Sequence, residues 1–499
     1  MNKKFKNLEL IAPAGNLEKM KTAFAFGADA VYAGIPDFSL RVRINDFTIA
    51  KLGQAVKYAR AKNKKIYITI NIFAHNKHIK KLPAFVKKLK ELKPDGLIIS
   101  DPGVLQVVKK IWPQANIHLS TQANCTNSQA AKFWHEQGIK RVILGRETTL
   151  DEIKEIHKKV PKLELEYFVH GAMCMAYSGR CFLSKYFTDR SANLGDCAQP
   201  CRWNYLTPSP STPPPPPPSP KQEMGSNKSP YYLGGAGGGI DEASHKFIQA
   251  EGRDETLEIV EEKHGSYILN SKDLCLIKRL AELEKAGVKH FKIEGRAKSV
   301  YYIANVAGIY AKAINNLTPA PASSAGQALS LLRRGGGAKQ RGRGELDFLY
   351  KELEEKLFHR GYTEGFLFGN GKLAQNLDDS HKKCNWEFCG QITKTRKHEN
   401  TKTQKHSASP QNTKTRKHKN TKTQKYDIYI KVHNSLKVGD EVEIVMPFYD
   451  IIKMRVESMK DSKTGEELNQ AHGGQGKAVV IESDVEAPEF SVVRRNVKK

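Results

Sequence analysis

The stretch LELIAPAGNLEKMKTAFAFGADAVYAG, residues 8–34, contains two short apolar runs separated by a segment of helical period. The runs LELIA and AVYA have the length and composition of buried strands. The segment between them begins at Asn16, a good helix N-cap, and places Glu18 in the first turn. A strand, a helix and a second strand in this order predict a parallel βα unit.

The same unit recurs along the first 300 residues. Further apolar runs of strand length lie at residues 65–72, 96–100, 117–121, 141–145, 165–170 and 290–294. Helical segments lie between them, and one of these, SQAAKFWHEQG, is predicted to begin at its Ser and to end at its Gly. Eight such repeats predict an α/β protein with a closed, TIM-like (β/α)₈ barrel, and an open doubly wound sheet is the alternative.

Composition divides the chain of 499 residues into further parts. We expect residues 1–320 to form a catalytic barrel with a Pro- and Gly-rich insert at about 207–250. Residues 321–345 have the composition of a basic, Gly-rich linker. Residues 346–499 predict a helix and turn followed by a small all-β barrel, and the duplicated basic segment at 393–425 within it is expected to be disordered.

The chain is strongly basic, with a formal net charge of +28. Residues 393–425 carry eleven Lys or Arg and one Glu, which is +10 of this total. The remaining charge favours nucleic acid as a partner, and a solvated basic surface is the alternative. No apolar run reaches the roughly 18 residues that a membrane span needs, and the first residues do not resemble a signal peptide. We therefore expect a cytoplasmic protein with no membrane partner.

Polar side chains follow the predicted strands at the points where the strands end. In chain order they are Arg41, Arg43, Asn71, His75, Asp101, Gln122, Asn124, Arg146, Glu147, His170, Glu294, Arg296 and Lys298. Any one of these residues is more often a helix cap or half of an ion pair than a catalytic group. Because catalytic groups of such barrels lie at the carboxyl ends of the strands, their shared position indicates a candidate active site there.

Four of the eight cysteines, Cys174, Cys181, Cys197 and Cys201, lie close together after the seventh predicted strand. In a reducing compartment such a group indicates metal or redox chemistry rather than disulfides. The spacing C-x6-C-x15-C-x3-C matches zinc knuckles poorly, and it suits an iron–sulfur cluster, whose irons each need one thiolate. Zinc and unligated thiols are the alternatives.

The other cysteines and the remaining motifs give only weak indications of function. Cys275 is expected on a helix face as a small apolar residue. Cys384 and Cys389 form a C-x4-C pair, a weak zinc signal whose alternative is strand packing. The sequence has no phosphate-binding loop with its lysine, no H-E-x-x-H and no G-x-S-x-G, so known hydrolase signatures are missing.

Several long motifs resemble those of the bacterial collagenase-like peptidase family. They are EYFVHGAMCMAYSGRCFLS, FSLRVRINDF, IHLSTQAN, FKIEGRAKSVYYIA and HRGYTEGF. The resemblance covers most of residues 7–317, resumes at about 345–370 and extends loosely into the tail. It implies a hydroxylase, or a component of one, in place of a protease. It is greatest to the branch that helps to convert the wobble uridine of tRNA to 5-hydroxyuridine.

The resemblance also implies cofactors and partners. It implies oxygen-independent hydroxylation, a 4Fe-4S cluster on the four clustered cysteines, and prephenate as the hydroxyl source or required metabolite. The implied partners are tRNA, a small carboxylate metabolite and an electron-donor protein. A peptidase, a noncatalytic RNA-binding protein and a hydroxylase of rRNA cytidine remain the alternative functions.

Six residues are candidates for the remaining chemistry of such an enzyme. Carboxylate or phosphate binding is expected from Arg41, Arg43, Arg296 and Lys298, because guanidinium and ammonium groups pair with these anions. Proton transfer is expected from His170 and Glu294. The wobble base is unpaired, so it can enter a pocket without the free-energy cost of breaking a base pair.

Overall fold

The computed structural model describes most of the chain. The described residues are 8–40, 46–174, 176–202, 205–206, 246–250, 256–259, 271–317, 338–369, 384–398 and 424–497. Among them, no helix is both long enough and apolar enough to cross a membrane.

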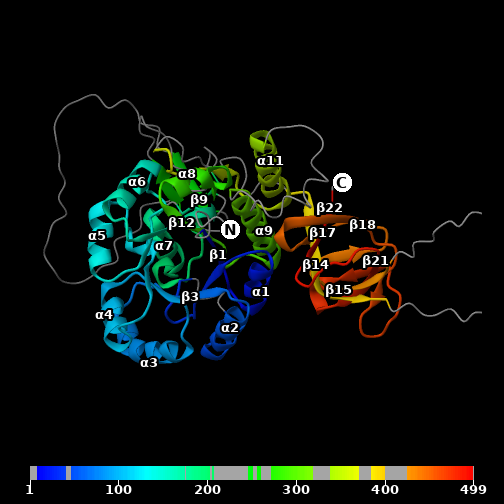
Figure 1. Ribbon diagram of the computed structural model, residues 1–499, viewed down its shortest axis with the longest axis horizontal. Helices are drawn as coiled ribbons and strands as arrows, with labels where there is room; N and C mark the ends of the chain where they lie inside the picture. Colours follow the sequence, from blue (N-terminus) through cyan, green and yellow to red (C-terminus); the bar gives the residue numbers. More distant parts are fainter. Residues whose placement is uncertain are drawn as a thin grey trace, which may run out of the picture.

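Eight parallel strands form a closed barrel, seen on the left of Figure 1. They are β1 (Glu9–Pro13), β2 (Ala30–Ala33), β3 (Lys65–Ile70), β4 (Gly96–Ile99), β5 (Ile117–Leu119), β6 (Arg141–Ile143), β7 (Glu164–Gly171) and β12 (Val288–Ile293). Neighbours in sequence pair with one another, and β12 pairs with both β7 and β1. The barrel prediction is therefore confirmed, and the open sheet is excluded. All eight predicted runs are strands, with ends that differ by at most two residues.

Helices lie between the strands and form the outer layer of the barrel. They are α1 (Leu17–Ala25), α2 (Ile49–Ala61), α3 (Asn76–Leu92), α4 (Pro102–Ile111), α5 (Ser128–Glu136), α6 (Leu150–Lys159), α8 (Leu280–Lys285) and α9 (Val300–Leu317). The predicted cap of α1 is confirmed, because the Asn16 side chain accepts from the Lys19 backbone N–H at 2.9 Å. Helix α5 begins at Ser128 as predicted, and Asn127 before it is the cap, because its side chain accepts from the Ala130 N–H at 2.9 Å.

The connection between β7 and β12 contains the cysteine segment and several short strands. After the short helix α7 (Leu183–Thr188), the strands β8 (Tyr205–Leu206), β9 (Lys246–Ala250) and β10 (Thr256–Ile259) form an antiparallel sheet. The polyproline and glycine stretches predicted here lie outside the described residues. Strand β11 (Asp273–Cys275) then pairs antiparallel with β7. Cys275 therefore lies on a strand and not on the predicted helix, although it is buried as expected of a small apolar residue.

The predicted linker at 321–345 differs from the structure. Helix α11 (Ala338–Lys356) begins inside that stretch and packs against α9. Its buried Leu349 and Leu353 belong to the main hydrophobic core, which explains how a helix forms from so glycine-rich a start. Strand β13 (Tyr362–Thr363) follows and pairs with β11.

The C-terminal part is an antiparallel sheet with its own core, on the right of Figure 1. Its strands are β14 (Trp386–Lys397), β15 (Tyr426–Val432), β17 (Glu441–Met446), β18 (Asp450–Arg455), β19 (Lys460–Asp461), β21 (Ala478–Ser483) and β22 (Val492–Asn496), with β16 (Ser435–Lys437) and β20 (Gln470–His472) as a separate pair. The start of the duplicated segment, expected to be disordered from residue 393, instead continues β14 to Lys397, because it pairs with β15. Residues 399–423 lie outside the described part.

A buried arginine joins the C-terminal sheet to the barrel part. Arg494 on β22 is fully buried, and its guanidinium lies 2.5 Å from Glu352 on α11 and 2.7 Å from Glu443 on β17. It also donates to the side chain of Asn305 on α9 at 3.0 Å. Because the partners come from both parts, this cluster fixes how the tail sits on the barrel.

Candidate active site

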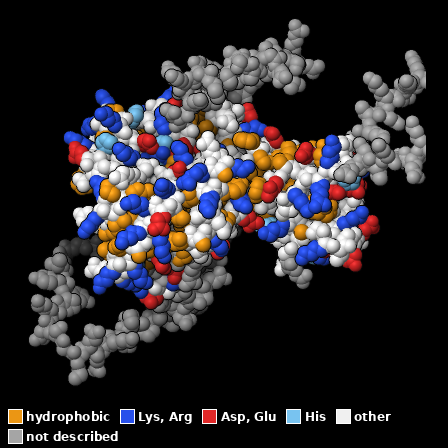
Figure 2. Space-filling model, turned by 60° about the horizontal axis from the view of Figure 1, so that its bottom comes forward, with side chains coloured by type: hydrophobic (Ala, Val, Ile, Leu, Met, Phe, Trp, Pro, Cys, Tyr) orange, Lys and Arg blue, Asp and Glu red, His pale blue; other side chains and the backbone are white. Residues whose placement is uncertain are grey.

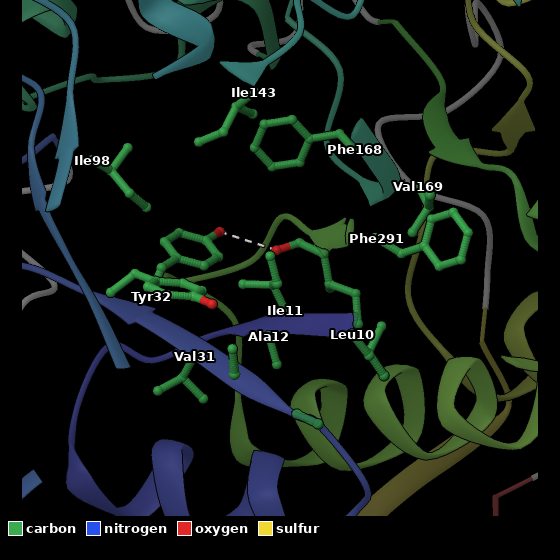
Figure 3. Close-up of a cluster of buried hydrophobic side chains, with 14 of the residues drawn as sticks. Leu10, Ile11, Ala12, Val31, Tyr32, Ile98, Ile143, Phe168, Val169 and Phe291 are labelled. Atoms are coloured by element: carbon green, nitrogen blue, oxygen red, sulfur yellow. Dashed lines mark hydrogen bonds between the residues drawn. The ribbon is translucent and has the colours of Figure 1, made fainter. Parts of the chain in front are cut away.

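A cavity of about 490 Å³ opens at the carboxyl ends of the barrel strands. Figure 3 shows Tyr32, Ile98, Ile143 and Phe168 pointing toward one another from different strands, and all four line the cavity. The cavity is lined further by polar side chains that follow the strands and by the four clustered cysteines. A mostly apolar cavity of this size with a few convergent polar groups is typical of a small-molecule or base-binding site.

The barrel interior beneath the cavity holds a buried network of charged groups. Arg141 Nη1 lies 2.8 Å from Glu9 and 3.3 Å from Glu166, and Lys292 Nζ lies 2.7 Å from the other oxygen of Glu166. His290 Nδ1 lies 2.9 Å from Glu9. Burial lowers the pKa of Lys292, and the negative charge of Glu166 opposes that shift. Of these five residues, Lys292 alone lines the cavity.

Glu294, one of the two predicted proton-transfer residues, lines the cavity. Its Oε2 accepts from the Tyr32 hydroxyl at 3.2 Å, and the same hydroxyl donates to the Ile293 carbonyl at 3.0 Å, the hydrogen bond marked at Tyr32 in Figure 3. Burial, and then the carboxylate of Glu294, raise the pKa of Tyr32 well above its usual value. The pair therefore offers a carboxylate held by a neutral phenol at the edge of the site.

His170, the other predicted proton-transfer residue, does not line the cavity. It is almost fully buried on β7, where its ring packs against Tyr302, Tyr310 and Tyr362. Its Nδ1 lies 3.3 Å from the Tyr310 hydroxyl. Burial lowers its pKa to about 3, so the imidazole is neutral near pH 7.

The predicted anion-binding residues fall into three groups. Arg296 lines the cavity, but its Nη1 donates to Ser39 Oγ at 2.6 Å and to Thr69 Oγ1 at 3.2 Å, and its Nη2 donates to the Leu40 carbonyl. Lys298 is not among the lining residues, and its ammonium lies 5.3 Å from the centre of the Tyr302 ring. Arg41 and Arg43 lie outside the described residues.

All four clustered cysteines line the cavity. Cys174 is exposed, and Cys181, Cys197 and Cys201 are partly buried. Burial raises the pKa of the Cys181 thiol, and the nearby Cys197 and Cys174 raise it further, because a neighbouring thiolate disfavours a second negative charge. The structure thus brings the four sulfurs that the sequence singles out to one site.

Hydrogen bonds from the barrel hold the cysteine segment over the cavity. Ser178 donates its hydroxyl to Glu147 Oε2 at 2.6 Å. The Asn193 side chain accepts from the Cys181 backbone N–H at 3.1 Å, and the Asn193 carbonyl accepts from the Phe73 N–H at 3.2 Å. The segment is therefore tied both to the β6–α6 loop and to the β3–α3 loop.

The donor chemistry of this segment fits an iron–sulfur cluster. Four thiols from an irregular segment converge on one cavity, and the Gln199 backbone N–H already donates to Cys197 Sγ at 3.3 Å, the kind of bond that tunes a cluster sulfur. Within the described part of the chain, no three Cys, His, Asp or Glu side chains are gathered closely enough to hold a single metal ion. Each thiolate of a cluster binds a different iron, so a cluster does not need its four sulfurs to meet at one ion.

Other predicted rim residues divide between the cavity and structural roles. Asn71, Gln122 and Arg146 line the cavity. Asp101 instead caps α4 by accepting from the Val104 N–H at 2.9 Å, and His75 precedes α3 as its N-cap residue. Asn71, Gln122 and Arg146 therefore lie at the site as predicted, whereas Asp101 and His75 are the N-cap residues of α4 and α3.

Comparison with protein families decides which group of proteins shares this arrangement. A model of peptidase family U32 matches residues 15–378, and a model of the U32 C-terminal domain matches residues 417–494. The chain belongs to peptidase family U32. The family resemblance noted in the sequence is thereby confirmed.

Curated relatives of this U32 chain match it over nearly its whole length. Two proteins named tRNA hydroxylation protein P are 37% identical (Haemophilus influenzae) and 36% identical (Escherichia coli). The first alignment covers 95% of this chain and 92% of the relative, and the second covers 98% and 96%. The 23S rRNA 5-hydroxycytidine C2501 synthase of Escherichia coli is 29% identical over 72% of this chain and 45% of its own length.

Tyr32, Phe168 and Lys292 are among the cavity residues of this U32 chain that sequence reasoning missed. All three lie within strands and have buried neighbours on both sides in the sequence, so little in the pattern distinguishes them from core residues. The only available signal was the alternation HFKIE, which places Lys292 on the same face of β12 as Glu294.

Proposed function

We propose that this chain is a tRNA hydroxylase that converts the wobble uridine to 5-hydroxyuridine without oxygen, with prephenate as hydroxyl source or required metabolite. Support comes from the two relatives named tRNA hydroxylation protein P, which align over 95% and 98% of the chain. The observation that carries the proposal is the convergence of four cysteines, Glu294 and Lys292 on one cavity. A cavity with thiols and both charge signs suits redox chemistry on a small polar ring.

The four cysteines are the proposed ligands of a 4Fe-4S cluster, with zinc as the alternative metal. Such a cluster would supply one-electron chemistry at the cavity, fed by an electron-donor protein. The residues of the chain would hold the sulfurs in place through the Glu147 and Asn193 contacts and keep water away with Tyr32 and Phe168.

Binding and proton transfer are assigned to the polar residues of the cavity. Arg41, Arg43, Arg296 and Lys298 remain the proposed partners of carboxylate or phosphate groups. Among the two proton-transfer candidates, Glu294 is favoured by its place in the cavity, whereas the burial of His170 among three tyrosines favours a packing role. The Tyr32 hydroxyl would orient the Glu294 carboxylate toward the substrate.

Binding of tRNA is supported by the charge of the surface around the site. Helix α3, which follows β3 at the cavity rim, carries six lysines and one glutamate. Figure 2 shows Lys and Arg side chains spread across the visible face of the molecule, with fewer Asp and Glu. Such a surface attracts the phosphate backbone and makes the affinity depend on salt. The substrate places the proposed reaction in the cytoplasm.

The metal content of protein purified without oxygen tests the proposal. About four irons and four sulfides are expected in the wild-type protein, and their loss is expected in a Cys174→Ser, Cys181→Ser double variant. A Cys384→Ser, Cys389→Ser double variant is the matched control, because neither of these residues lines the cavity. It should retain the cluster.

The activity is tested by mass spectrometry of tRNA nucleosides from a deletion strain complemented with each variant. Wild type and control should restore 5-hydroxyuridine, and the Cys174→Ser, Cys181→Ser variant should not. Zinc alone in the pure protein, or full 5-hydroxyuridine with the cavity cysteines replaced, would refute the redox proposal. Hydroxycytidine in rRNA should be measured in the same strains, because the rRNA synthase is also a relative. Its loss in place of 5-hydroxyuridine would favour that second function.

A further inference from the structure

A buried lysine lies at the base of the cavity, on a strand of the barrel. Lys292 on β12 is only 3% exposed, yet it is one of the cavity-lining residues. Its Nζ lies 2.7 Å from Glu166 Oε1, on a residue that is fully buried. The same ammonium lies 4.3 Å from the centre of the Tyr32 ring and 5.6 Å from that of Phe168.

The hydrogen bonds of this ammonium are incomplete among the described residues. A lysine ammonium has three N–H donors. Glu166 accepts one of them, and no other described residue accepts a hydrogen bond from Nζ. The ring faces of Tyr32 and Phe168 offer electrostatic attraction but no lone pair. Two donors are therefore left for whatever occupies the cavity.

The carboxylate beside Lys292 is shared with a second cation. Glu166 Oε2 also lies 3.3 Å from Nη1 of Arg141, which is not among the residues that line the cavity. The negative charge of Glu166 is thus divided between two cations, so it neutralises Lys292 only in part. A buried cation in this position favours an anion as its further partner, because the charge has little water around it.

We propose that Lys292 is a ligand-binding residue that receives the carboxylate of a small molecule whose apolar body lies between Tyr32, Phe168, Ile98 and Ile143. The inference deepens the proposed function and rests on it, since it assigns the carboxylate of the co-substrate to a residue outside the clamp of Arg41, Arg43, Arg296 and Lys298. The guanidinium of Arg296 already binds Ser39, Thr69 and Leu40, whereas the ammonium of Lys292 has donors to offer.

The test compares two variants that each remove a cation from Glu166. Lys292→Met removes the cation that lines the cavity, and Arg141→Met removes the one that does not. Binding of prephenate and of benzoate to the full-length protein is measured by titration calorimetry, with benzamide as the uncharged probe. We expect Lys292→Met to weaken binding of both carboxylates at least tenfold, whereas Arg141→Met should change it less than about threefold. Benzamide binding should be the same in all three proteins.

Misfolding is controlled by a second variant. Removing one partner of a buried ion pair leaves the other charge uncompensated, which destabilises a protein more than removing both partners. The Lys292→Met, Glu166→Gln double variant should therefore fold even if Lys292→Met alone does not. It should show the same loss of carboxylate binding. Unchanged affinity in the Lys292 variants, equal loss in Arg141→Met, or no binding of either carboxylate to wild type would each overturn the proposal.

The measurement is independent of the reaction. It uses neither RNA nor turnover, so loss of carboxylate binding in Lys292→Met would keep Lys292 as a ligand-binding residue even if the wild-type chain restores no 5-hydroxyuridine, the outcome that would refute the hydroxylase assignment. Normal 5-hydroxyuridine formation by Lys292→Met, with unchanged carboxylate affinity, would refute the Lys292 proposal and keep the hydroxylase.

Discussion

Ser178, between the first two clustered cysteines, donates its hydroxyl to Glu147 Oε2 at 2.6 Å, and its backbone N–H donates to the other oxygen of the same carboxylate. Ser178 has a left-handed backbone, with φ of 42°, which is unfavourable for a residue other than glycine. One carboxylate from the β6–α6 loop therefore holds a strained turn in the segment that carries Cys174 and Cys181.

Replacement of Glu147 by Gln should loosen this turn. The amide keeps the shape but turns one acceptor into a donor, so one Ser178 donor loses its partner at a cost of roughly 1–3 kcal/mol in the free energy of unfolding. We expect less iron and sulfide per chain after anaerobic purification. Glu152→Gln is the control, because Glu152 is an exposed capping residue on the adjacent helix. Equal iron content in Glu147→Gln and wild type would show that the segment needs no such support.

Arg360 and Asp273 form a second support behind the cysteine segment. Both side chains are buried, with Nη2 2.6 Å from Asp273 Oδ1, and Nη2 also lies 3.4 Å from the Met173 carbonyl. Removing one partner of a buried pair leaves the other charge uncompensated, so Arg360→Met should lower the free energy of unfolding by about 3–5 kcal/mol. Urea denaturation measures it. Arg279→Met, which breaks a more exposed pair with Glu364, should cost less than about 1 kcal/mol.

The pH dependence of stability should show the titration of His290 in the folded protein. Burial lowers the pKa of His290, but hydrogen bonds with Glu164 and Glu9 outweigh burial and leave the pKa above 6.5. A pKa raised in the folded state gives a contribution that is complete below about pH 6.5 and is lost as the pH rises through the folded value. His290→Gln should therefore destabilise the protein more at pH 6 than at pH 9, by urea denaturation at both pH values.

The comparison must be made against wild type at each pH. His118 and His170 have lowered pKa values because of burial, so their contributions are present above about pH 6.5 and are lost as the pH falls. Both proteins contain His118 and His170, so these contributions cancel in the difference between the unfolding free energies of the variant and wild type at one pH. A destabilisation by His290→Gln that is equal at pH 6 and pH 9 would show that His290 does not titrate as described.

The fold could be predicted where a short apolar run decided the element. All eight barrel strands are such runs, and closure follows from their number and parallel order. The strand β11 could not be predicted, because it has three residues and begins with Asp273, whose place depends on Arg360 far along the chain. The start of α11 was missed for a similar reason, because packing of Leu349 and Leu353 stabilises it and local propensity does not.

The candidate site could be predicted only in part. The cysteines were found because their density is unusual, and Glu294 was found because it follows a strand. Lys292 was missed because both faces of a barrel strand are buried, so alternation does not separate an inward polar residue from a surface one. His170 was chosen from its position at the end of β7, but its ring lies among three tyrosines, which only the three-dimensional packing could reveal.

The attachment of the C-terminal sheet should depend on Arg494. This arginine bridges Glu352 of the barrel part and Glu443 of the sheet, with no exposure to solvent. Arg494→Met would leave two buried carboxylates without their main partner, so we expect a loss of about 3–5 kcal/mol in the free energy of unfolding. Because the sheet has its own hydrophobic core, we also expect its unfolding to separate from that of the barrel in calorimetry. Lys453→Met is the matched control.

Lys453 Nζ lies 3.8 Å from the same Glu443 carboxylate, but its side chain is 80% exposed. Its removal should change stability by less than about 0.5 kcal/mol, because water replaces an exposed ammonium at little cost. A single calorimetric transition for Arg494→Met at the wild-type temperature would mean that the apolar contacts of Val445 and Val492 with the main core hold the sheet on their own. Two transitions in the arginine variant and one in the lysine variant would assign the attachment to the buried charge cluster.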